Sequence, residues 1–517
     1  MTETLVKKEY LKIGKATELS GRDRTLYRFL EMVPGILSWG TLVGLIVLSY
    51  FFPVFVAFFI IAFDIYWLLL VIYLIIHLLF SYYRLQTNKI INWREKCDEL
   101  KKNGKNWEDY WQLIVLPYYN EGLDVIEPTI EKIYSCGYPL QNMILVLAVE
   151  ERGGAQALEN AKIIEQKYGN RFKHFLITVH PDNIPGEIKG KGSNQAYAGR
   201  KIKEEIVDKY NLAYDKILVS VFDIDTIIYK DYFYCLIHKF LTVKDPYLAS
   251  YQPIPVYHNN IWEAKFFARI SASSNTFWQM MQQIRQEKLA TYSSHSMPWQ
   301  ALVDIGFWST TMVSEDSRIF WHCLCYYQGN YRVEPLYYPV SMDVCAAGSF
   351  METAKNLYKQ QRRWGWGVEN VPYLIFNTIK NWKILPKGRM ISRILVQIYG
   401  FHSWATNALI IAVIGWMPLI LGGDRFRTTV LSTNLPFVTR TLMIIAMLGL
   451  LVSSVVSTML LPRRPANYKF YKKFLMLLEW ALLPITIILF GSIPGLDSQT
   501  RIMFGKYLGF FVTPKSR

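Results

Sequence analysis

Hydrophobic residues in this sequence are concentrated in long runs near both ends, and between those runs short apolar segments alternate with polar ones. In residues 33–80, only Asp64 and His77 have an acidic or basic side chain. This run is too long for one membrane-spanning helix of about 20 residues and long enough for two. Pro53 lies near the expected reversal. We therefore predict two transmembrane helices within residues 33–82.

Three further apolar stretches lie near the C-terminus, at roughly 394–421, 441–461 and 474–493. We predict that residues 386–517 form a second membrane section with these segments. The last stretch contains Glu479 and Pro484. A carboxylate in the middle of a span costs a few kcal/mol unless it is neutralised or paired. This stretch is therefore the one that we expect to be re-entrant or to lie flat on the surface.

Basic residues flank the first two predicted spans, and the reversal between the spans has none. The residues before the first span are Lys7, Lys8, Lys12, Lys15, Arg22, Arg24 and Arg28, and those after the second are Arg84, Lys89, Arg94, Lys96, Lys101, Lys102 and Lys105. Lys and Arg are enriched in cytosolic flanks. We predict that residues 1–32 and 83–110 are basic cytosolic segments, and that the chain is a multi-pass protein of the cell membrane with its central domain in the cytoplasm.

The side on which the C-terminal tail lies is left open by the same rule. Arg463, Arg464, Lys469, Lys472 and Lys473 place the loop before the last apolar stretch inside, so that counting spans puts the tail outside. The tail itself carries Arg501, Lys506, Lys515 and Arg517, which indicate the inside.

The stretch from 111 to 385 has the pattern of a separate α/β domain. Continuous apolar strands are expected at 113–116, 144–151, 173–180 and 216–225, with helical spacing at 124–135 and 155–168. We expect Pro117 to stop the first strand. Strands that are apolar throughout and alternate with helices indicate a mostly parallel sheet covered on both faces. Ligands of such sheets bind at the carboxyl ends of the strands.

Composition narrows the class of protein. The chain has 517 residues, of which 51% are hydrophobic and 15% aromatic, and only six are Cys. Disorder is excluded because disordered chains are poor in aromatic residues, and a secreted disulfide scaffold is excluded because the six Cys have no repeating spacing. The net charge is +16. Because much of it flanks the apolar runs and no nucleic-acid module is present, we expect no nucleic-acid partner.

Polar residues gather at the predicted strand ends. Asp223 and Asp225 follow an apolar strand. Two carboxylates on either side of one residue are either a solvated turn or ligands of a hard cation such as Mg²⁺ or Mn²⁺, which prefers oxygen donors and substrate phosphates. Lys191 lies in a loop with Gly190 and Gly192 and before a helix that we expect to start near Ser193. This loop is either a phosphate cradle or a flexible basic loop.

Two further elements each allow two interpretations. Ser314, Glu315 and Asp316 precede an apolar helical run, so they are either a helix N-terminus with first-turn acids or a site in which one carboxylate acts as general base. Residues 360–367 read Gln-Gln-Arg-Arg-Trp-Gly-Trp-Gly. They form either an amphipathic helix on the membrane surface or a group that contacts phosphate and sugar.

Taken in order, these motifs resemble the inverting family-two glycosyltransferases with a GT-A fold. More narrowly, they resemble the membrane-embedded branch that includes cellulose, chitin and hyaluronan synthases. The resemblance covers about residues 112–370 and the flanking spans. The matching elements are Pro117-Tyr118-Tyr119-Asn120-Glu121, Lys191-Gly192-Ser193-Asn194, Asp223-Ile224-Asp225, Glu315-Asp316, and Gln360 with Arg363 and Trp364.

The resemblance implies a role for each matching residue. A nucleotide-sugar donor, either a UDP- or a GDP-sugar, would bind its base near Tyr119, Glu121 and Glu150 and its diphosphate on Mg²⁺ or Mn²⁺ held by Asp225 and Asp223. Lys191, Asn194, Gln360 and Arg363 would complete the donor site. Asp316, beside Glu315, would take the proton of the acceptor hydroxyl. Trp364 would stack on the acceptor sugar, and His295 would either touch the acceptor or be core.

Three departures from the family pattern stand out. Where the family usually has two Asp after the second strand, this sequence has Glu150, Glu151 and Arg152. This departure bears on which nucleobase the donor carries. Ser314 replaces the common Thr before Glu-Asp. Residues 292–296 are atypical where the family holds its acceptor sugar.

The resulting hypothesis is a metal-dependent hexosyltransferase that extends a polysaccharide or glycolipid at the cytosolic face of the membrane. A close alternative is transfer of one sugar to a polyprenyl phosphate or lipid. A remote alternative is a transporter without enzymatic activity, for which Asp64 and Glu479 in apolar stretches are the only support. A transferase fold that has lost its activity is a further class, and the intact Asp223, Asp225 and Asp316 argue against it.

Overall fold

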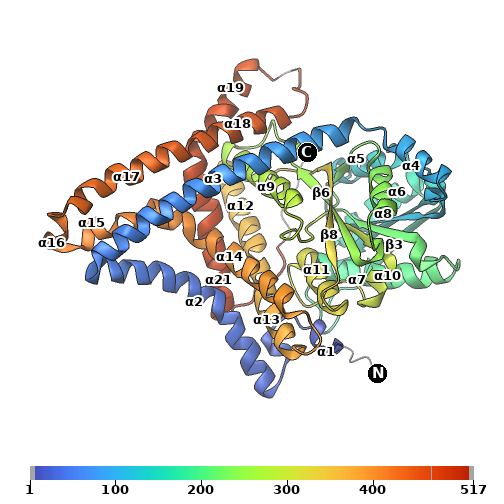
Figure 1. Cartoon of the computed structure of the whole chain (residues 1–517). Coiled ribbons are helices and arrows are strands. Elements are labelled where there is room, and N and C mark those ends of the chain that lie inside the picture. Colours follow the sequence, from blue (N-terminus) through green and yellow to red (C-terminus); the bar gives the residue numbers. More distant parts are fainter. Residues whose placement is uncertain (1–5, 467, 512–517) are drawn as a thin grey trace.

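The computed structural model describes residues 6–466 and 468–511, and its centre is a mixed sheet of eight strands (Figure 1). The strand order is β3-β2-β1-β4-β7-β6-β8-β5. Neighbours pair in parallel from β3 to β4 and between β6 and β8, whereas β7 and β5 pair antiparallel. The strands are β1 (Trp111–Tyr118), β2 (Met143–Glu150), β3 (His174–His180), β4 (Ile217–Val221), β5 (Ile227–Ile228), β6 (Ala249–Val256), β7 (Ser296–Pro298) and β8 (Arg332–Ser341).

Helices cover both faces of this sheet because its strands are apolar on both sides. In β1, Ile114 and Leu116 enter one core, and Leu113 and Val115 enter the other, as the alternation of strand side chains requires. The first core is closed by α5 (Leu123–Tyr134), α6 (Gly154–Tyr168) and α8 (Tyr232–Thr242), and the second by α7 (Lys191–Ile202), α10 (Trp299–Asp304), α11 (Glu315–Tyr326) and α13 (Asn370–Lys380). The predicted class, a mostly parallel α/β domain flanked by apolar helices, is confirmed.

The predicted strands and helices up to β4 are present, with three differences. Strand β4 ends at Val221, so the prediction that it continues to Asp225 was wrong. Strand β1 continues through Pro117 to Tyr118, so the expectation that Pro117 stops it was wrong. The reason is that β4 pairs with β1 only as far as Val115, and beyond that point one side of β1 has no strand beside it. Helix α7 begins at Lys191, two residues before the expected start at Ser193.

The apolar ends of the chain form long helices that extend to one side of the sheet domain (Figure 1). The N-terminal pair is α2 (Gly21–Phe51) and α3 (Pro53–Ile90), which reach beyond the predicted section 33–82 at both ends. The C-terminal helices are α14 (Lys387–Ala412), α15 (Met417–Leu421), α16 (Gly423–Arg427), α17 (Val430–Ala446), α18 (Leu448–Leu460), α19 (Phe470–Leu478), α20 (Leu483–Ile487) and α21 (Ile493–Met503). Within the described residues, five stretches are long and apolar enough to cross a membrane: 21–51, 53–90, 387–412, 430–460 and 471–503.

The first four of these stretches form two pairs that leave the sheet domain and return to it. The turn between α2 and α3 lies far from the sheet, and Gly422 packs there against Pro53. At the returning end of α18, the Ser457 hydroxyl lies 3.2 Å from the hydroxyl of Ser273 in α9 (Phe266–Ile284), a helix of the sheet domain. Each pair therefore has its open end beside the sheet domain.

The fifth stretch, 471–503, lies along the sheet domain at both of its ends. Near its start, Glu479 accepts a 3.0 Å hydrogen bond from Arg269 of α9. Near its end, the Ser498 hydroxyl donates over 2.7 Å to the Arg362 carbonyl of α12 (Phe350–Gly365), a helix of the sheet domain. In Figure 1 this red segment runs between the long apolar helices and the sheet. The ion pair of Glu479 supplies the partner that a carboxylate in an apolar stretch requires.

The chain after this stretch returns to the sheet domain. Phe510 packs so closely on Gly190 that a Cβ atom there would lie 2.6 Å from its ring. This contact places the tail on the side of the sheet domain, which is the side that the charges of Arg501 and Lys506 favour and the opposite of the one that counting spans gives. The other two basic residues of the tail, Lys515 and Arg517, lie outside the described residues.

We expect membrane labelling to find Lys506 on the same side as the sheet domain. In separate variants, Cys would replace Asp424 at the far end of the helices, Lys101 beside the sheet domain, and Lys506 in the tail; the six native Cys are all buried. In sealed vesicles of one orientation, a membrane-impermeant maleimide should label Lys506→Cys from the side that labels Lys101→Cys and not from the side that labels Asp424→Cys. Labelling of Lys506→Cys together with Asp424→Cys would contradict this arrangement.

Candidate functional site

The two carboxylates of the Asp-x-Asp element lie at the middle of the sheet. Both follow β4, and the Phe222 amide between them and the strand donates to the Val115 carbonyl of β1 over 3.1 Å. The Asp223 side chain is 22% exposed, whereas Asp225 is buried. The carboxyl ends of β1 and β4 meet here, as they must in neighbouring parallel strands, so the site lies where a sheet of this kind binds ligands.

Lys191 joins this element to the Glu-Asp dipeptide. Its ammonium nitrogen Nζ lies 2.8 Å from Asp223 Oδ1 and 2.8 Å from Asp316 Oδ1. It also lies 3.9 Å from Glu315 Oε1. One buried cation therefore contacts three carboxylates from two separate segments. The sequence named all four residues, but their spacing along the chain gave no sign that they meet.

The charges of this cluster depend on one another. Burial alone would lower the pKa of Lys191, but the Asp223, Asp316 and Glu315 carboxylates outweigh it and raise that pKa. Burial, together with the neighbouring charge of Asp316, raises the pKa of Glu315 despite the opposing charge of Lys191. The lysine therefore stays charged, and Glu315 takes up a proton more readily than an exposed carboxyl.

Glycine is needed where the lysine loop meets the segment before α11. A Cβ on Gly192 would lie 2.7 Å from the Ser309 carbonyl oxygen and 3.1 Å from the Glu315 Cβ. The Ile188 amide donates to the Thr310 carbonyl over 2.7 Å, which holds the two segments together. Gly192 thus permits Lys191 to approach Glu315. From the sequence alone, this glycine belonged to either a phosphate cradle or a flexible basic loop.

Asp225 is surrounded by polar groups that the sequence did not single out. The backbone N–H of Asp343 donates to Asp225 Oδ2 over 3.1 Å. The side-chain amide of Asn259 donates to the backbone carbonyl of Asp225 over 2.9 Å and to Asp343 Oδ1 over 2.7 Å. Ser293 donates to Asp223 Oδ2 over 2.7 Å. These residues follow β6 and β8 or precede β7, so only the sheet order brings them here.

The carboxylate oxygens at this site suit a hard cation that also binds a phosphate ligand. Asp223 and Asp225 offer oxygen atoms, which Mg²⁺ and Mn²⁺ prefer. Among residues 6–466 and 468–511, no group of three or more His, Cys, Asp or Glu side chains is arranged as a metal site. Mg²⁺ is commonly held by one or two carboxylates and completed by substrate phosphates. The residues therefore fit a metal that shares its coordination with a phosphate ligand.

The residues that were predicted to bind the nucleobase of the sugar donor lie at the ends of β1 and β2. Glu121 accepts hydrogen bonds from the Tyr119 amide, over 3.1 Å, and from the next amide. Glu150 forms an ion pair with Arg152, whose guanidinium lies 4.5 Å from the Tyr119 ring centre. Asn194 is fully buried and donates to the Ala148 carbonyl of β2 over 2.6 Å. Asn194 therefore ties α7 to β2, and Glu121 braces its own loop.

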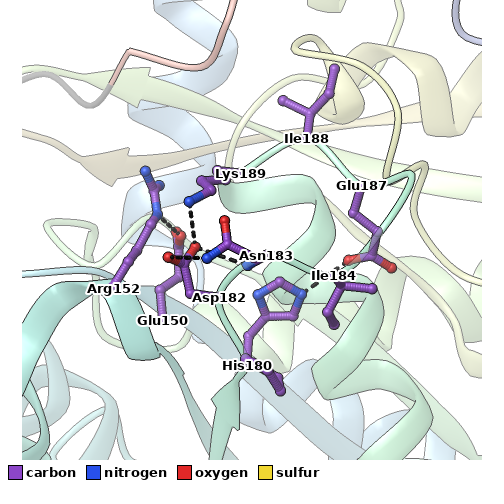
Figure 2. Close-up of a pocket in the computed structure, with 10 residues that line it drawn as sticks. Glu150, Arg152, His180, Asp182, Asn183, Ile184, Glu187, Ile188 and Lys189 are labelled. Atoms are coloured by element: carbon purple, nitrogen blue, oxygen red, sulfur yellow. Dashed lines mark hydrogen bonds and ion pairs between the residues drawn. The ribbon is translucent and has the colours of Figure 1, made fainter.

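A cavity of about 220 Å³ opens beside Glu150 (Figure 2). Its walls come from the end of β2 and from the loop after β3, and include Arg152, His180, Asp182, Glu187 and Lys189. An ion pair and a hydrogen bond line it: Lys189 Nζ lies 2.7 Å from Asp182 Oδ1, and His180 Nε2 lies 3.0 Å from Glu187 Oε2. Glu150 is the only predicted site residue that lines this cavity.

The remaining predicted residues lie on α12 (Phe350–Gly365) and before β7. The guanidinium of Arg363 lies 4.8 Å from the Phe510 ring centre, and Gln360 is half-buried. Trp364 packs against an apolar cluster around Tyr257. His295 is buried and its Nδ1 lies 2.9 Å from the Tyr292 carbonyl, and burial lowers its pKa.

Phe510 is a site residue that the sequence analysis missed. It lies between Gly190 of the lysine loop and Arg363 of α12. It belongs to the chain after the last apolar stretch, more than 300 residues from that loop in sequence. No local signal could have predicted a contact of this range.

Replacing Lys191 should destabilise the protein far more than replacing its neighbour Lys189. Lys191→Met leaves the buried Glu315 and the partly exposed Asp223 and Asp316 without their cation, a loss worth about 3 kcal/mol in the free energy of unfolding. Lys189 pairs with Asp182 at the surface, where its side chain is 49% exposed, so Lys189→Met should cost less than about 1 kcal/mol. Denaturant unfolding in detergent measures both, and equal losses would refute the buried cluster.

Glu315→Gln should gain stability relative to the wild type as the pH rises. The folded protein keeps the Glu315 proton to a higher pH than the unfolded chain, whose ordinary value is 4.5. The wild type therefore loses stability as the pH rises above that value, and the variant, which has no proton to lose at this position, does not. Thermal unfolding of both proteins at pH 5 and pH 8 measures the difference. An identical difference at both pH values would contradict the raised pKa.

Comparison with known structures gives likenesses of low sequence identity. The mannosyltransferase PcManGT from Pyrobaculum calidifontis, in complex with GDP-Man and Mn²⁺, is 13% identical with a TM-score of 0.40, covering 77% of this chain and 98% of its own. TarS residues 1–349 from S. aureus is 10% identical with a TM-score of 0.34, covering 68% of this chain and 91% of its own. A search of curated proteins finds no match.

The assignment rests instead on the sequence itself. Residues 218–491 match the family model described as "Glycosyl transferase family group 2". The matched region begins in β4 and includes Asp223, Asp225, Glu315, Asp316 and Arg363. It covers more than half of the chain, and the predicted GT-A fold class agrees with it. The chain belongs to glycosyl transferase family group 2.

Proposed function

We propose that this protein is a membrane-bound inverting hexosyltransferase. It moves a sugar from a nucleotide-diphosphate donor to a growing polysaccharide or a glycolipid at the cytosolic face of the membrane. The observation that carries the proposal is the position of Lys191, which is in hydrogen-bonding contact with both Asp223 and Asp316. A donor diphosphate bound at Asp223 would therefore lie beside the carboxylate that serves as base.

The donor occupies the carboxyl ends of β1, β2 and β4. Its nucleobase lies near Tyr119, Glu121 and Glu150, and the cavity of about 220 Å³ beside Glu150 gives room for it. Its diphosphate lies toward Lys191 and Arg363, whose charges oppose those of the phosphates. Arg363 is suited to this contact because a planar guanidinium binds phosphate oxygens in pairs. Gln360 and Asn194 complete the donor side.

Mg²⁺ or Mn²⁺ held by Asp223 and Asp225, when bound, supplies charge that stabilises the leaving diphosphate. Lys191 adds a fixed positive charge on the same side, which assists the departure of that group. The diphosphate competes with Asp223 and Asp316 for the Lys191 ammonium. Donor binding thus weakens the hold of Lys191 on Asp316.

Asp316 is the general base. Its carboxylate takes the proton of the acceptor hydroxyl while that oxygen forms a bond to the anomeric carbon. The bond from this carbon to the diphosphate oxygen breaks, and its electron pair leaves with the nucleoside diphosphate. Attack from the face opposite the leaving group inverts the anomeric centre. Glu315, buried beside Asp316, lies 3.9 Å from the Lys191 ammonium, and Trp364 offers a flat apolar face to the acceptor sugar.

Turnover with a panel of donors tests this proposal. Membranes containing the protein would receive radiolabelled UDP-glucose, UDP-N-acetylglucosamine and GDP-mannose, with Mn²⁺ or with a chelator. We expect sugar transfer from at least one donor, abolished by the chelator and restored by Mn²⁺. Asp316→Asn should lower kcat by about 100-fold or more, the typical contribution of a general base.

Three results would count against the proposal. Absence of nucleoside diphosphate release with every donor would refute transferase activity. Full activity of Asp316→Asn would refute the assigned base, and full activity with chelator would refute the metal. The length of the labelled product on a gel separates a polymer from a single transferred sugar.

A further inference from the structure

We propose that Glu369 is a positioning residue that holds Asp316 in place from a separate helix. The inference rests on the proposed function, since it takes Asp316 to be the base. Glu369 ends η8 (Trp366–Glu369), the turn that directly follows α12. It was not among the residues that the sequence motifs singled out. Its side chain belongs to a buried network that joins the start of α11 to the end of α12.

The carboxylate of Glu369 binds the residue that precedes the Glu-Asp dipeptide. Its Oε1 accepts hydrogen bonds from the Ser314 amide, over 3.0 Å, and from the Ser314 hydroxyl, over 2.5 Å. Its Oε2 accepts one from the Trp366 indole nitrogen over 3.0 Å. Ser314 is the N-cap of α11, but its own side chain caps no amide of the helix. The Glu369 carboxylate, and not the Ser314 side chain, therefore fixes the N-terminal end of α11.

The next residue, Asn370, extends the same clamp by one helical turn. Arg318 donates to Asn370 Oδ1 over 2.7 Å, and Asn370 donates to the Ser317 hydroxyl over 2.9 Å. Arg318 is 1% exposed, and it also donates to the Ile13 carbonyl of the N-terminal segment over 2.8 Å. Ser314, Ser317 and Arg318 lie on either side of Asp316 in sequence. Two consecutive residues, Glu369 and Asn370, therefore hold the chain on both sides of Asp316.

A buried carboxylate at this position is costly unless it serves as an acceptor. Glu369 is 6% exposed, and burial raises its pKa while the Arg318 charge and the Ser314 hydrogen bonds oppose the rise. Apolar residues of similar volume would often replace such a group at no loss of stability. What an apolar side chain could not do is accept from Ser314 and Trp366 together. The clamp thus couples the helix of Gln360 and Arg363 to the base.

The experiment compares Glu369→Ala, Glu369→Gln and a matched control, Glu334→Gln. Glu334 is a similarly buried carboxylate, 7% exposed and paired with Arg332 over 2.6 Å, near the start of β8 and thus at the far end of that strand from the site. The donor is whichever of the three labelled nucleotide sugars gives the fastest turnover with Mn²⁺. Misplacing a reacting group by about 1 Å can cost about 100-fold in rate. We expect Glu369→Ala to lower kcat by that factor while the donor KM changes by less than about threefold, since the donor's own contacts are intact.

Glu369→Gln keeps one acceptor oxygen for Ser314 and should restore kcat to within about tenfold of the wild type. Hydrogen–deuterium exchange of the full-length protein gives a readout that needs no turnover. In Glu369→Ala, the amides of residues 309–318 should exchange about tenfold faster, whereas Glu334→Gln should leave them unchanged.

Three outcomes overturn the inference: wild-type kcat in Glu369→Ala, an effect confined to KM, or unchanged exchange at residues 309–318. Asp316→Asn in the same assay separates this failure from failure of the proposed function. If Asp316→Asn is inactive and Glu369→Ala is not, only the positioning role is wrong. If Asp316→Asn is fully active, the base assignment is wrong, and the exchange data alone decide whether the clamp exists.

Discussion

The ammonium group of Lys191, held among three carboxylates, is the interaction on which the rest of the site depends. Without that cation, Asp223, Asp316 and Glu315 would repel one another at short range in a poorly solvated space. With it, two segments that are far apart in sequence meet at the carboxyl ends of β1 and β4. The same charge suits a diphosphate, so one residue serves both the stability of the site and the proposed binding of the donor.

The surrounding structure keeps this cluster compact. Gly192 lets the lysine loop approach Glu315 to a distance that a side chain would prevent. Glu369 and Asn370 fix the first turn of α11, and Phe510, in the chain that follows the last apolar stretch, packs on Gly190 and Arg363. Each contact comes from a different part of the chain. The C-terminal apolar helices thus help to position the site, because the segment that carries Phe510 follows them directly in the chain.

Local patterns in the sequence predicted the strands and helices well, but they predicted poorly which residues of different elements contact one another at the site. The apolar runs of β1, β2 and β4 identified the strands, and the motifs named Lys191 and Asp316, because hydrophobic periodicity and residue type are local properties. Asn259, Asp343 and Glu369 carry no such signal, since only the order of the sheet and the packing of helices bring them to the site. For the fifth apolar stretch, Glu479 and Pro484 already indicated from the sequence that it differs from the other spans, but the partner of Glu479, Arg269 of the sheet domain, carries no local signal.

A structure of the protein with Mn²⁺ and the nucleoside diphosphate of its active donor tests the central claim most directly. The account predicts that Lys191 Nζ lies about 3 Å from a phosphate oxygen. It also predicts that Asp223 and Asp225 face the metal and that Asp316 is released from Lys191 toward the acceptor side. A nucleotide bound away from β1 and β4, or a Lys191 that still pairs with both Asp223 and Asp316 and touches no phosphate, would contradict it.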